Sequence, residues 1–238
     1  MAKQALSPKT SMTSKPRAAS SPVPLLLKER AYHEIRELIQ TGELTSESNV
    51  SERQLAQRLG MSKTPIRAAL ENLEMQGLVT VSPQRGILVR ELSAREIAEL
   101  FDVRAAIEPF IASQLARRTL TTSQRDQLKA NLREQRLAAK AADALGATQL
   151  DIAFHRLLAS LLENQEMKVW LERCFDKLHR SVLRVNQMAR NRLLKSYEDH
   201  DAVARSILSG SPDEAARQMK EHLAFGRQFL LVGESHLD

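Results

Sequence analysis

The sequence has little of what secreted, membrane-spanning or β-rich proteins depend on. Cys174 is the only cysteine, which excludes an intrachain disulfide and is typical of a protein of the reducing cytoplasm. No apolar run approaches the roughly 20 residues that span a bilayer, and no signal-peptide core is present. We therefore expect a cytoplasmic protein with no membrane partner.

Glycine, proline and aromatic residues are also scarce, with eight glycines, eight prolines and 4% aromatic residues among 238. The abundant residues are Leu, Ala, Arg, Glu and Gln, most of which favour helices. Hydrophobic residues make up 42% of the chain and charged residues 27%, which is enough for one large or two medium globular domains. This composition predicts a mainly α fold.

The formal net charge of +6 is unevenly distributed along the chain. Residues 1–24 carry four basic and no acidic residues, whereas residues 25–92 carry nine of each. The first segment lacks an apolar period and is predicted to be disordered, either as a solvated tail or as a basic arm that contacts phosphates. The local excess of basic residues is more informative, because positions 51–70 contain four basic residues and only one acidic residue.

Helical spacing and end signals predict a winged helix-turn-helix domain over residues 25–91. Ser51 is a suitable cap for one short helix, and Ser62 or Thr64 for the next. Two apolar runs around a turn that contains Pro83 and Gly86 predict a β-hairpin. The three helices are expected at residues 26–41, 52–59 and 62–76, and the hairpin at 78–89.

The start of the third predicted helix has the residue types that read DNA. The N-terminus of a helix in the major groove meets base edges and phosphates, which hydroxyl, amide and cationic groups can contact. The preceding helix and the hairpin turn add further basic residues. The candidate DNA-binding residues are Arg53, Ser62, Lys63, Thr64, Arg67, Arg85 and Gly86. A helical hairpin that uses these residues only as surface charge is the alternative.

The run SERQLAQRLGMSKTPIRAALENLEMQGLVTVSPQRGILV, residues 51–89, resembles the DNA-binding domain of the GntR family of bacterial regulators. The likeness extends residue type by residue type over about thirty positions, which is far more than a generic helix-turn-helix pattern. Lys63 stands where many members have arginine, and lysine lacks the bidentate fork for guanine. The resemblance implies contacts to operator DNA from Arg53, Lys63, Thr64, Arg67 and Gly86.

A second, all-α domain is predicted from residue 92 to residue 232, followed by a short tail at 233–238. The residues from Ser93 to Glu96 form a capping box directly after the hairpin, without a long linker. Movement in this domain can therefore reach the DNA-binding helices. The bundle is expected to contain six helices, at residues 93–118, 122–142, 147–162, 165–188, 196–208 and 211–231.

Four residues of this second domain form a candidate metal site. Asp151 and His155 are four residues apart and share a helical face, while His200 and His222 lie on the last two predicted helices. One carboxylate and three imidazoles suit Zn²⁺, Ni²⁺ or Mn²⁺. From spacing alone, ordinary polar positions remain the simpler interpretation.

The segments RAAIEP, residues 104–109, and DIAFH, residues 151–155, resemble the FCD effector domain of one GntR subfamily, the FadR type. So do the two later helices that carry single histidines. The resemblance implies that a divalent metal, Zn or alternatively Ni or Mn, is bound by Asp151, His155, His200 and His222. It also implies a small carboxylate effector, that is, a metabolite whose binding alters DNA affinity.

Arg104 is the candidate second clamp on that carboxylate, since guanidinium matches carboxylate geometry. A buried pair with Glu108, four residues later, is the equally plausible alternative. Arg180 and Arg184 line either the same pocket or the surface. We expect structural roles for Cys174, His179 and His236, and a helix end at Asn164.

Together these patterns predict a homodimeric, ligand-responsive transcriptional regulator that binds a near-palindromic operator. Repression relieved by ligand is the usual behaviour of the family that the sequence resembles. The competing function is that of a metal-dependent hydrolase, because an Asp and three His with open positions can activate water. Against it, no spare Glu or His is evident as a general base, no catalytic residue is assigned, and the DNA-binding motif would be unexplained.

Overall fold

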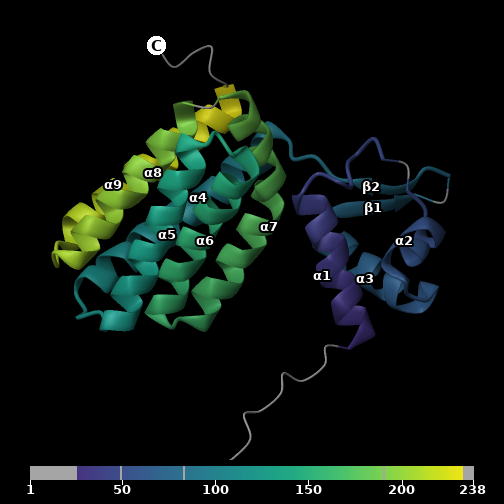
Figure 1. Cartoon of the computed structure of the whole chain (residues 1–238), viewed down its shortest axis with the longest axis horizontal. Helices are drawn as coiled ribbons and strands as arrows, with labels where there is room; N and C mark the ends of the chain where they lie inside the picture. The colour runs from purple at the N-terminus through teal and green to yellow at the C-terminus, as the bar shows by residue number, and fades with distance from the viewer. Residues whose placement is uncertain (1–25, 49, 83, 190, 233–238) are drawn as a thin grey trace, which may run out of the picture.

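The structure is a computed structural model and describes residues 26–48, 50–82, 84–189 and 191–232. Within these residues the chain forms nine helices and two strands, arranged as two groups that lie side by side (Figure 1). The predicted mainly α fold, a winged helix followed by a helical bundle, is confirmed. None of the described helices is both long and apolar enough to cross a membrane.

The N-terminal group is the winged helix. It contains α1 (Leu27–Gln40), α2 (Glu52–Leu59), α3 (Lys63–Met75), β1 (Val79–Ser82) and β2 (Gly86–Val89). Ser51 and Gln54 form a capping box that starts α2, and Gly60 ends this helix with a left-handed φ of +62°. The apolar faces of the helices meet in one core, around Ile35, Leu55, Ile66, Leu70 and Leu73.

The wing is an antiparallel hairpin in which Val79 lies opposite Val89 and Ser82 opposite Gly86. Val50 joins the hairpin from the α1–α2 connection, because its carbonyl oxygen accepts a hydrogen bond from the Ile87 amide at 2.8 Å. Gly86 has a φ of +76°, and a Cβ there would lie only 2.7 Å from the Val50 carbonyl oxygen. The fold itself therefore requires glycine at this position.

The C-terminal group is a helical bundle with its own core. It contains α4 (Ala94–Ala116), α5 (Thr122–Lys140), α6 (Ala144–Leu162), α7 (Gln165–Met188), α8 (Asn191–Leu208) and α9 (Pro212–Val232). Helix α4 runs along α9, α6 lies against α5 and α7, and α8 lies against α9 and α5. The largest fully buried side chains of this core include Leu115, Phe154 and Phe175.

The predicted helix limits differ most at the starts of α6 and α8. Helix α6 begins at Ala144 rather than at residue 147, because the Asp143 side chain accepts a hydrogen bond from the Gly146 amide at 3.0 Å. Helix α8 begins at Asn191 rather than at residue 196, and its first turn buries Arg192. The domain limits 25–91 and 92–232 stay predictions, and the segments 1–24 and 233–238, with His236, lie outside the described residues.

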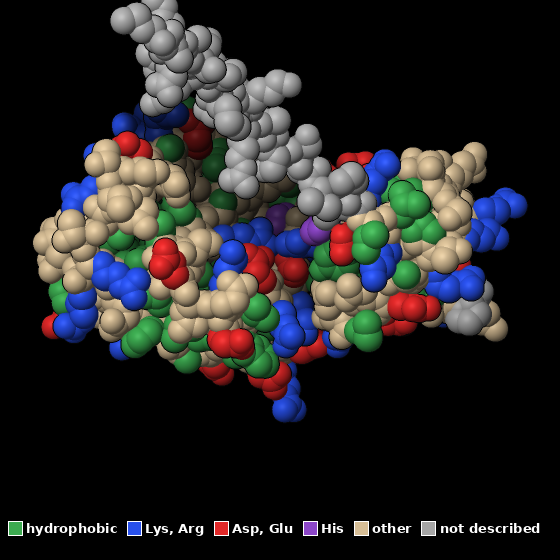
Figure 2. Space-filling view, turned by 90° about the horizontal axis from the view of Figure 1, so that it is seen from below, with side chains coloured by type: hydrophobic (Ala, Val, Ile, Leu, Met, Phe, Trp, Pro, Cys, Tyr) green, Lys and Arg blue, Asp and Glu red, His purple; other side chains and the backbone are tan. Residues whose placement is uncertain are grey.

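The two domains meet where α1 faces α7 (Figure 1). Arg36 of α1 forms a largely buried ion pair with Asp176 of α7, and Arg184 pairs with Glu91 at 2.6 Å on the surface. A groove of about 940 Å³ runs along this interface, lined by residues of both domains. Figure 2 shows side chains of both charges gathered in the hollow between the two domains.

Candidate metal site and DNA-contact surface

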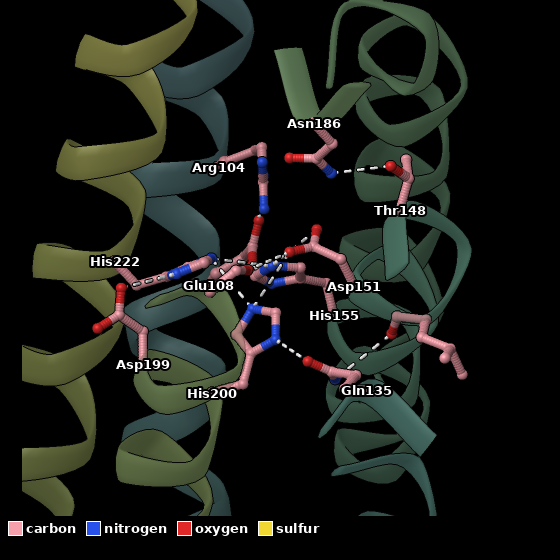
Figure 3. A network of polar contacts seen from close by, with 12 residues as sticks. Arg104, Glu108, Gln135, Thr148, Asp151, His155, Asn186, Asp199, His200 and His222 are labelled. Carbon is pink, nitrogen blue, oxygen red and sulfur yellow. Dashed lines mark hydrogen bonds and ion pairs between the residues drawn. The ribbon is translucent and has the colours of Figure 1, made fainter. Parts of the chain in front are cut away.

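The four predicted metal ligands, called here the Asp-His cluster, lie together inside the bundle (Figure 3). Asp151 and His155 project from α6, His200 from α8 and His222 from α9. Each residue offers one ligand atom, and these atoms all lie within 4.8 Å of one another. The three imidazoles are buried and the carboxylate is half-buried. Residues up to 71 positions apart are thus brought to a single point.

All three histidines present the same ring nitrogen, Nε2, to the centre of the cluster. His200 Nε2 lies 3.1 Å from His222 Nε2, which lies 3.3 Å from His155 Nε2. The Asp151 carboxylate oxygens lie 3.7 Å from His200 Nε2 and 3.9 Å from His155 Nε2. Phe154 stacks on the His200 ring at a centroid distance of 4.2 Å and holds it in this orientation.

Each Nδ1 atom, in turn, faces an oxygen that can accept its proton. The His155 Nδ1 contacts a carboxylate oxygen of Glu108. The His222 Nδ1 lies 3.6 Å from Asp199 Oδ2, and the His200 Nδ1 lies 2.8 Å from Gln135 Oε1. Of these three contacts, only the one between His200 Nδ1 and Gln135 has hydrogen-bond geometry, and it favours the tautomer with the proton on Nδ1 and the lone pair on Nε2. The carboxylates beside the other two Nδ1 atoms favour the same tautomer electrostatically.

The protonation states agree with this arrangement. Burial lowers the pKa of His200 well below its usual value and also lowers the pKa of His222, so both rings are neutral near pH 7. Burial would raise the pKa of Asp151, but the three histidines together hold that pKa below its usual value. The carboxylate is therefore ionised.

In that tautomer, three lone pairs and one carboxylate converge and repel one another. A divalent cation at the centre removes this repulsion, and nitrogen and oxygen donors from His and Asp suit Zn²⁺, Ni²⁺ and Mn²⁺. Carboxylate and amide oxygens that accept from Nδ1–H are the usual outer partners of metal-bound histidines. The residues present therefore fit a divalent metal.

Arg104 is buried and forms the pair with Glu108 that the sequence offered as one alternative. Its Nε donates to Glu108 Oε1 at 2.6 Å, while the other Glu108 oxygen faces His155. Burial alone would raise the Glu108 pKa, but Arg104 and His155 lower it to about 2. Arg104 thereby fixes the carboxylate that orients a cluster histidine. Its contact with an effector stays a prediction.

No sequence pattern indicated Gln135, Asp199 or the role of Glu108 beside His155. A small cavity of about 10 Å³ adjoins Asp151 and is lined by Gln135, Ala147, Asp151, Asn186, Leu193 and Ser196. Ser196 Oγ donates to Asp151 Oδ1 at 2.7 Å. These residues have no distinctive spacing in the sequence, and only the packing of α5 against α6 and α8 brings them together.

Other predicted residues lie away from the cluster. Asn164 caps α7 by accepting a hydrogen bond from the Met167 amide at 3.0 Å, as expected of a helix end. Arg180 and Arg184 line a groove at the domain interface and not the Asp-His cluster. Cys174 and His179, for which structural roles are expected, are both buried.

The candidate DNA-contact residues form an exposed surface on the winged helix. Ser62, Lys63, Thr64 and Arg67 lie on the first turns of α3, Arg53 lies on α2, and Arg85 lies in the wing turn, all of them exposed. Gly86, by contrast, is partly buried against Val50. Arg67 donates to Glu52 Oε2 at 3.0 Å, and this hydrogen bond raises its pKa.

Ser62 caps α3, but its hydroxyl makes no capping hydrogen bond. A cap side chain normally accepts from the amide of the second or third helical residue. The third residue here is Pro65, which has no N–H to donate. The Ser62 hydroxyl therefore stays available on the exposed end of α3.

Comparison with known proteins identifies both domains. Residues 27–89 match the family described as bacterial regulatory proteins, gntR family, and residues 99–225 match the FCD domain. The first range contains α1 to β2, and the second contains the whole Asp-His cluster.

Similar proteins are transcriptional regulators. An uncharacterised HTH-type transcriptional regulator in the TAR-I ttuE-ttuC' intergenic region of Agrobacterium vitis is 34% identical over 134 residues, which are 55% of this chain and 77% of the relative. The HTH-type transcriptional repressor RspR of Escherichia coli K12 is 29% identical over 180 residues, 73% of this chain and 75% of the relative. The solved structure of E. coli McbR/YncC matches with a TM-score of 0.78 at 18% identity, over 87% of this chain and 98% of that protein, and supports the fold.

Proposed function

Because the chain belongs to the GntR family of bacterial regulators and carries an FCD domain, we propose that it is a homodimeric repressor controlled by a small organic acid at a metal. A DNA-binding transcriptional regulator, unlike a metal-dependent hydrolase, uses both domains of the chain. The observation that carries the metal part of the proposal is the convergence of the three histidine Nε2 atoms and the Asp151 carboxylate. We place the protein in the cytoplasm, where its DNA target is.

In this proposal α3 enters the major groove. Its exposed Ser62, Lys63, Thr64 and Arg67 contact bases and phosphates, while Arg53 and the wing residues Arg85 and Gly86 contact the flanking backbone. The free Ser62 hydroxyl and the helix N-terminus suit a phosphate oxygen. Arg67 exchanges its exposed pair with Glu52 for DNA, which costs little because exposed ion pairs are weak.

A face of α4 supports the homodimer. Val103, Ala106 and Phe110 are exposed at helical spacing, and Phe110 is 46% exposed in the single chain. If a second copy packs antiparallel about this face, Phe110 of each copy lies opposite the small Ala106 of the other. The same arrangement places Glu99 of one copy near Arg117 of the other, so the surface is self-complementary, as a two-fold interface requires. Phe110→Asp should then give monomers in light scattering.

Metal at the Asp-His cluster would supply a Lewis acid that binds a carboxylate oxygen of the effector. The protein residues hold this site in place: Glu108, Gln135 and Asp199 keep the histidine lone pairs pointed inward. The effector then favours one arrangement of the paired DNA-binding domains and changes the spacing of the two α3 helices.

Metal analysis and a gel shift test this function together. Purified protein, prepared without chelators, should hold about one metal equivalent per chain, and His155→Ala/His222→Ala should lose it. Arg67→Ala should abolish binding to an operator selected from random DNA, while the exposed Arg205→Ala on the bundle should leave it unchanged. Metal-free wild-type protein refutes the metal site, and undiminished DNA binding by Arg67→Ala refutes the DNA assignment.

A further inference from the structure

A second buried arginine lies beside the proposed effector site, and it has no acidic partner. Arg192, in the first turn of α8, is only 8% exposed. Among the described residues, no carboxylate forms an ion pair with it, and its Nε atom is buried without a hydrogen-bond acceptor. Its two visible interactions are a hydrogen bond from Nη1 to Asn186 Oδ1 at 2.5 Å and the Phe229 ring at 5.1 Å.

Two other charged groups near the cluster, by contrast, have a direct counter-ion. Arg104 is neutralised by Glu108, and Asp199 by Lys195 at 2.5 Å. Burial is the main reason why the Arg192 pKa lies below its usual value, and the carboxylates of Asp151 and Asp199, which form no ion pair with Arg192, oppose this only in part. A buried charge is normally matched by a counter-charge, because its removal from water is otherwise uncompensated. Arg192 therefore has the surroundings of a group that awaits an anion.

Polar side chains connect Arg192 to the cluster. Asn186, which accepts from Arg192, donates from its Nδ2 to Thr148 Oγ1 at 2.8 Å. Asn186 also lines the small cavity that adjoins Asp151, together with Leu193 of α8. Figure 3 shows Asn186, Thr148 and Arg104 on the same side of the three histidines. An anion held by Arg192 would thus lie one side chain away from a ligand bound at the metal.

The charges around the site point to a dianion. A divalent metal beside the Asp151 carboxylate keeps one uncompensated positive charge, since Glu108 is already used by Arg104. Arg192 adds a second. We propose that Arg192 binds an acidic group of the effector, and that the effector is a small dicarboxylate with one carboxylate at the metal and the other at Arg192. This assignment rests on the proposed function, in which an organic acid completes the metal site.

Binding of such a molecule requires the site to expand. The cavity of about 10 Å³ holds no more than about one water molecule. Three of its six lining residues, Asn186, Leu193 and Ser196, belong to α7 and α8, and Arg192 lies in the first turn of α8. A dicarboxylate that bridges the metal and Arg192 therefore displaces the start of α8 relative to α6. This displacement is the conformational difference that an effector needs in order to shift the protein between two states.

The test compares acids that share a carbon skeleton. Metal-loaded full-length protein is titrated by calorimetry with malonate, succinate and glutarate, and with propionate, butyrate and pentanoate as their monocarboxylate partners. At least one dicarboxylate should bind at least about tenfold tighter than its partner, which is the usual size of a charge-assisted buried pair. Arg192→Met should reduce this preference to less than about twofold. Arg205→Met, on the exposed side of the same helix, should retain it.

A second measurement separates ligand binding from a purely structural role. Thermal unfolding of ligand-free Arg192→Met should occur at or above the wild-type temperature, because a buried charge without a counter-ion is removed. A lower unfolding temperature with an unchanged dicarboxylate preference would show that Arg192 only supports the fold. Equal affinity of wild-type protein for all matched pairs, or no binding at all, also overturns the assignment.

Metal content and operator binding of the same samples distinguish this failure from failure of the proposed function. Wild-type protein that holds metal and binds operator but shows no dicarboxylate preference contradicts the Arg192 assignment alone. Wild-type protein that holds no metal contradicts both.

Discussion

Replacing Gln135 by leucine should weaken metal binding by about 10- to 100-fold, although Gln135 does not reach the metal position. Its Nε2 donates to Asn131 Oδ1 at 2.6 Å, which turns Oε1 toward His200 Nδ1 at 2.8 Å. The His200 proton is thereby held on Nδ1, and the lone pair of Nε2 faces the cluster. Leucine fills a similar volume but accepts no hydrogen bond.

The size of the effect follows from the burial of His200, which is 0% exposed. Without Gln135, the proton of the metal-free ring can move to Nε2, which lies 3.1 Å from the acceptor nitrogen of His222. To bind metal through Nε2, the His200 ring must return this proton to Nδ1. The buried Nδ1–H then has no acceptor, which costs about 1–3 kcal/mol. That cost falls on the metal-bound state alone and corresponds to the loss of affinity given above.

Competition with a chromogenic chelator at neutral pH measures this affinity. Gln127→Leu is the matched control, because it makes the same change at an exposed position of the same helix, α5. The control should bind metal as the wild type does. An affinity of Gln135→Leu within about twofold of wild type, or an equal loss in the control, would refute the proposed tautomer control.

Three further perturbations test other parts of the structure. Gly86→Ala should destabilise the winged helix in urea unfolding by clearly more than the roughly 1–2 kcal/mol expected for Gly42→Ala. Both glycines have a left-handed φ, but only at Gly86 does a backbone oxygen lie 2.7 Å from the added Cβ. Equal effects of the two substitutions would contradict this steric reason. Burial lowers the pKa of His179 to about 4, so the folded ring stays neutral while the unfolded one gains a proton below about pH 6.5, and stability should fall by roughly 2–3 kcal/mol between pH 6.5 and 4.5. In metal-free protein His179→Leu should remove that part of the pH dependence, and an unchanged profile would exclude His179 as its source. Asp176→Asn should reduce the response of operator binding to effector by about fivefold or more, whereas Asp201→Asn, at a half-buried position away from the interface, should not. Equal responses would rule out the interface ion pair as a link.

The sequence predicted those helices whose ends are marked by local chemistry. Ser51, Ser93 and Asn164 each accept a backbone hydrogen bond at a helix start, and each was recognisable as a cap from its residue type. The start of α8 carries no such marker within the described residues. Its first turn also buries Arg192, a residue type that normally faces solvent. The pattern of apolar residues therefore did not indicate which side of this turn packs into the bundle.

The cluster was predictable in its ligands but not in its supporting residues. The ligands follow a short motif and two single histidines, which the family resemblance connects. Gln135 lies 65 residues from His200, on a helix rich in polar residues, and nothing local distinguishes it from its exposed neighbours. The spacing of four residues indicates Glu108 only as the partner of Arg104, whereas its contact with His155 arises from tertiary packing.

The link between the cluster and the DNA-binding domain depends on one shared carboxylate. Arg156, next to His155 on α6, donates to Asp176 at 3.1 Å, and Asp176 also pairs with Arg36 of α1. The carboxylate and the Arg36 side chain are both largely buried, so the contact is more sensitive to geometry than a surface ion pair. A shift of α6 that draws Arg156 away breaks its ion pair with Asp176, which then pairs with Arg36 only. A shift of α7 instead moves the Asp176 carboxylate away from Arg36 of α1. Because α1 packs on α3, the helix proposed to enter the DNA groove, either change alters how α3 is held against the bundle. In the proposed function, effector binding at the cluster is therefore coupled to DNA binding through a short path of three charged side chains, without rearrangement of either hydrophobic core.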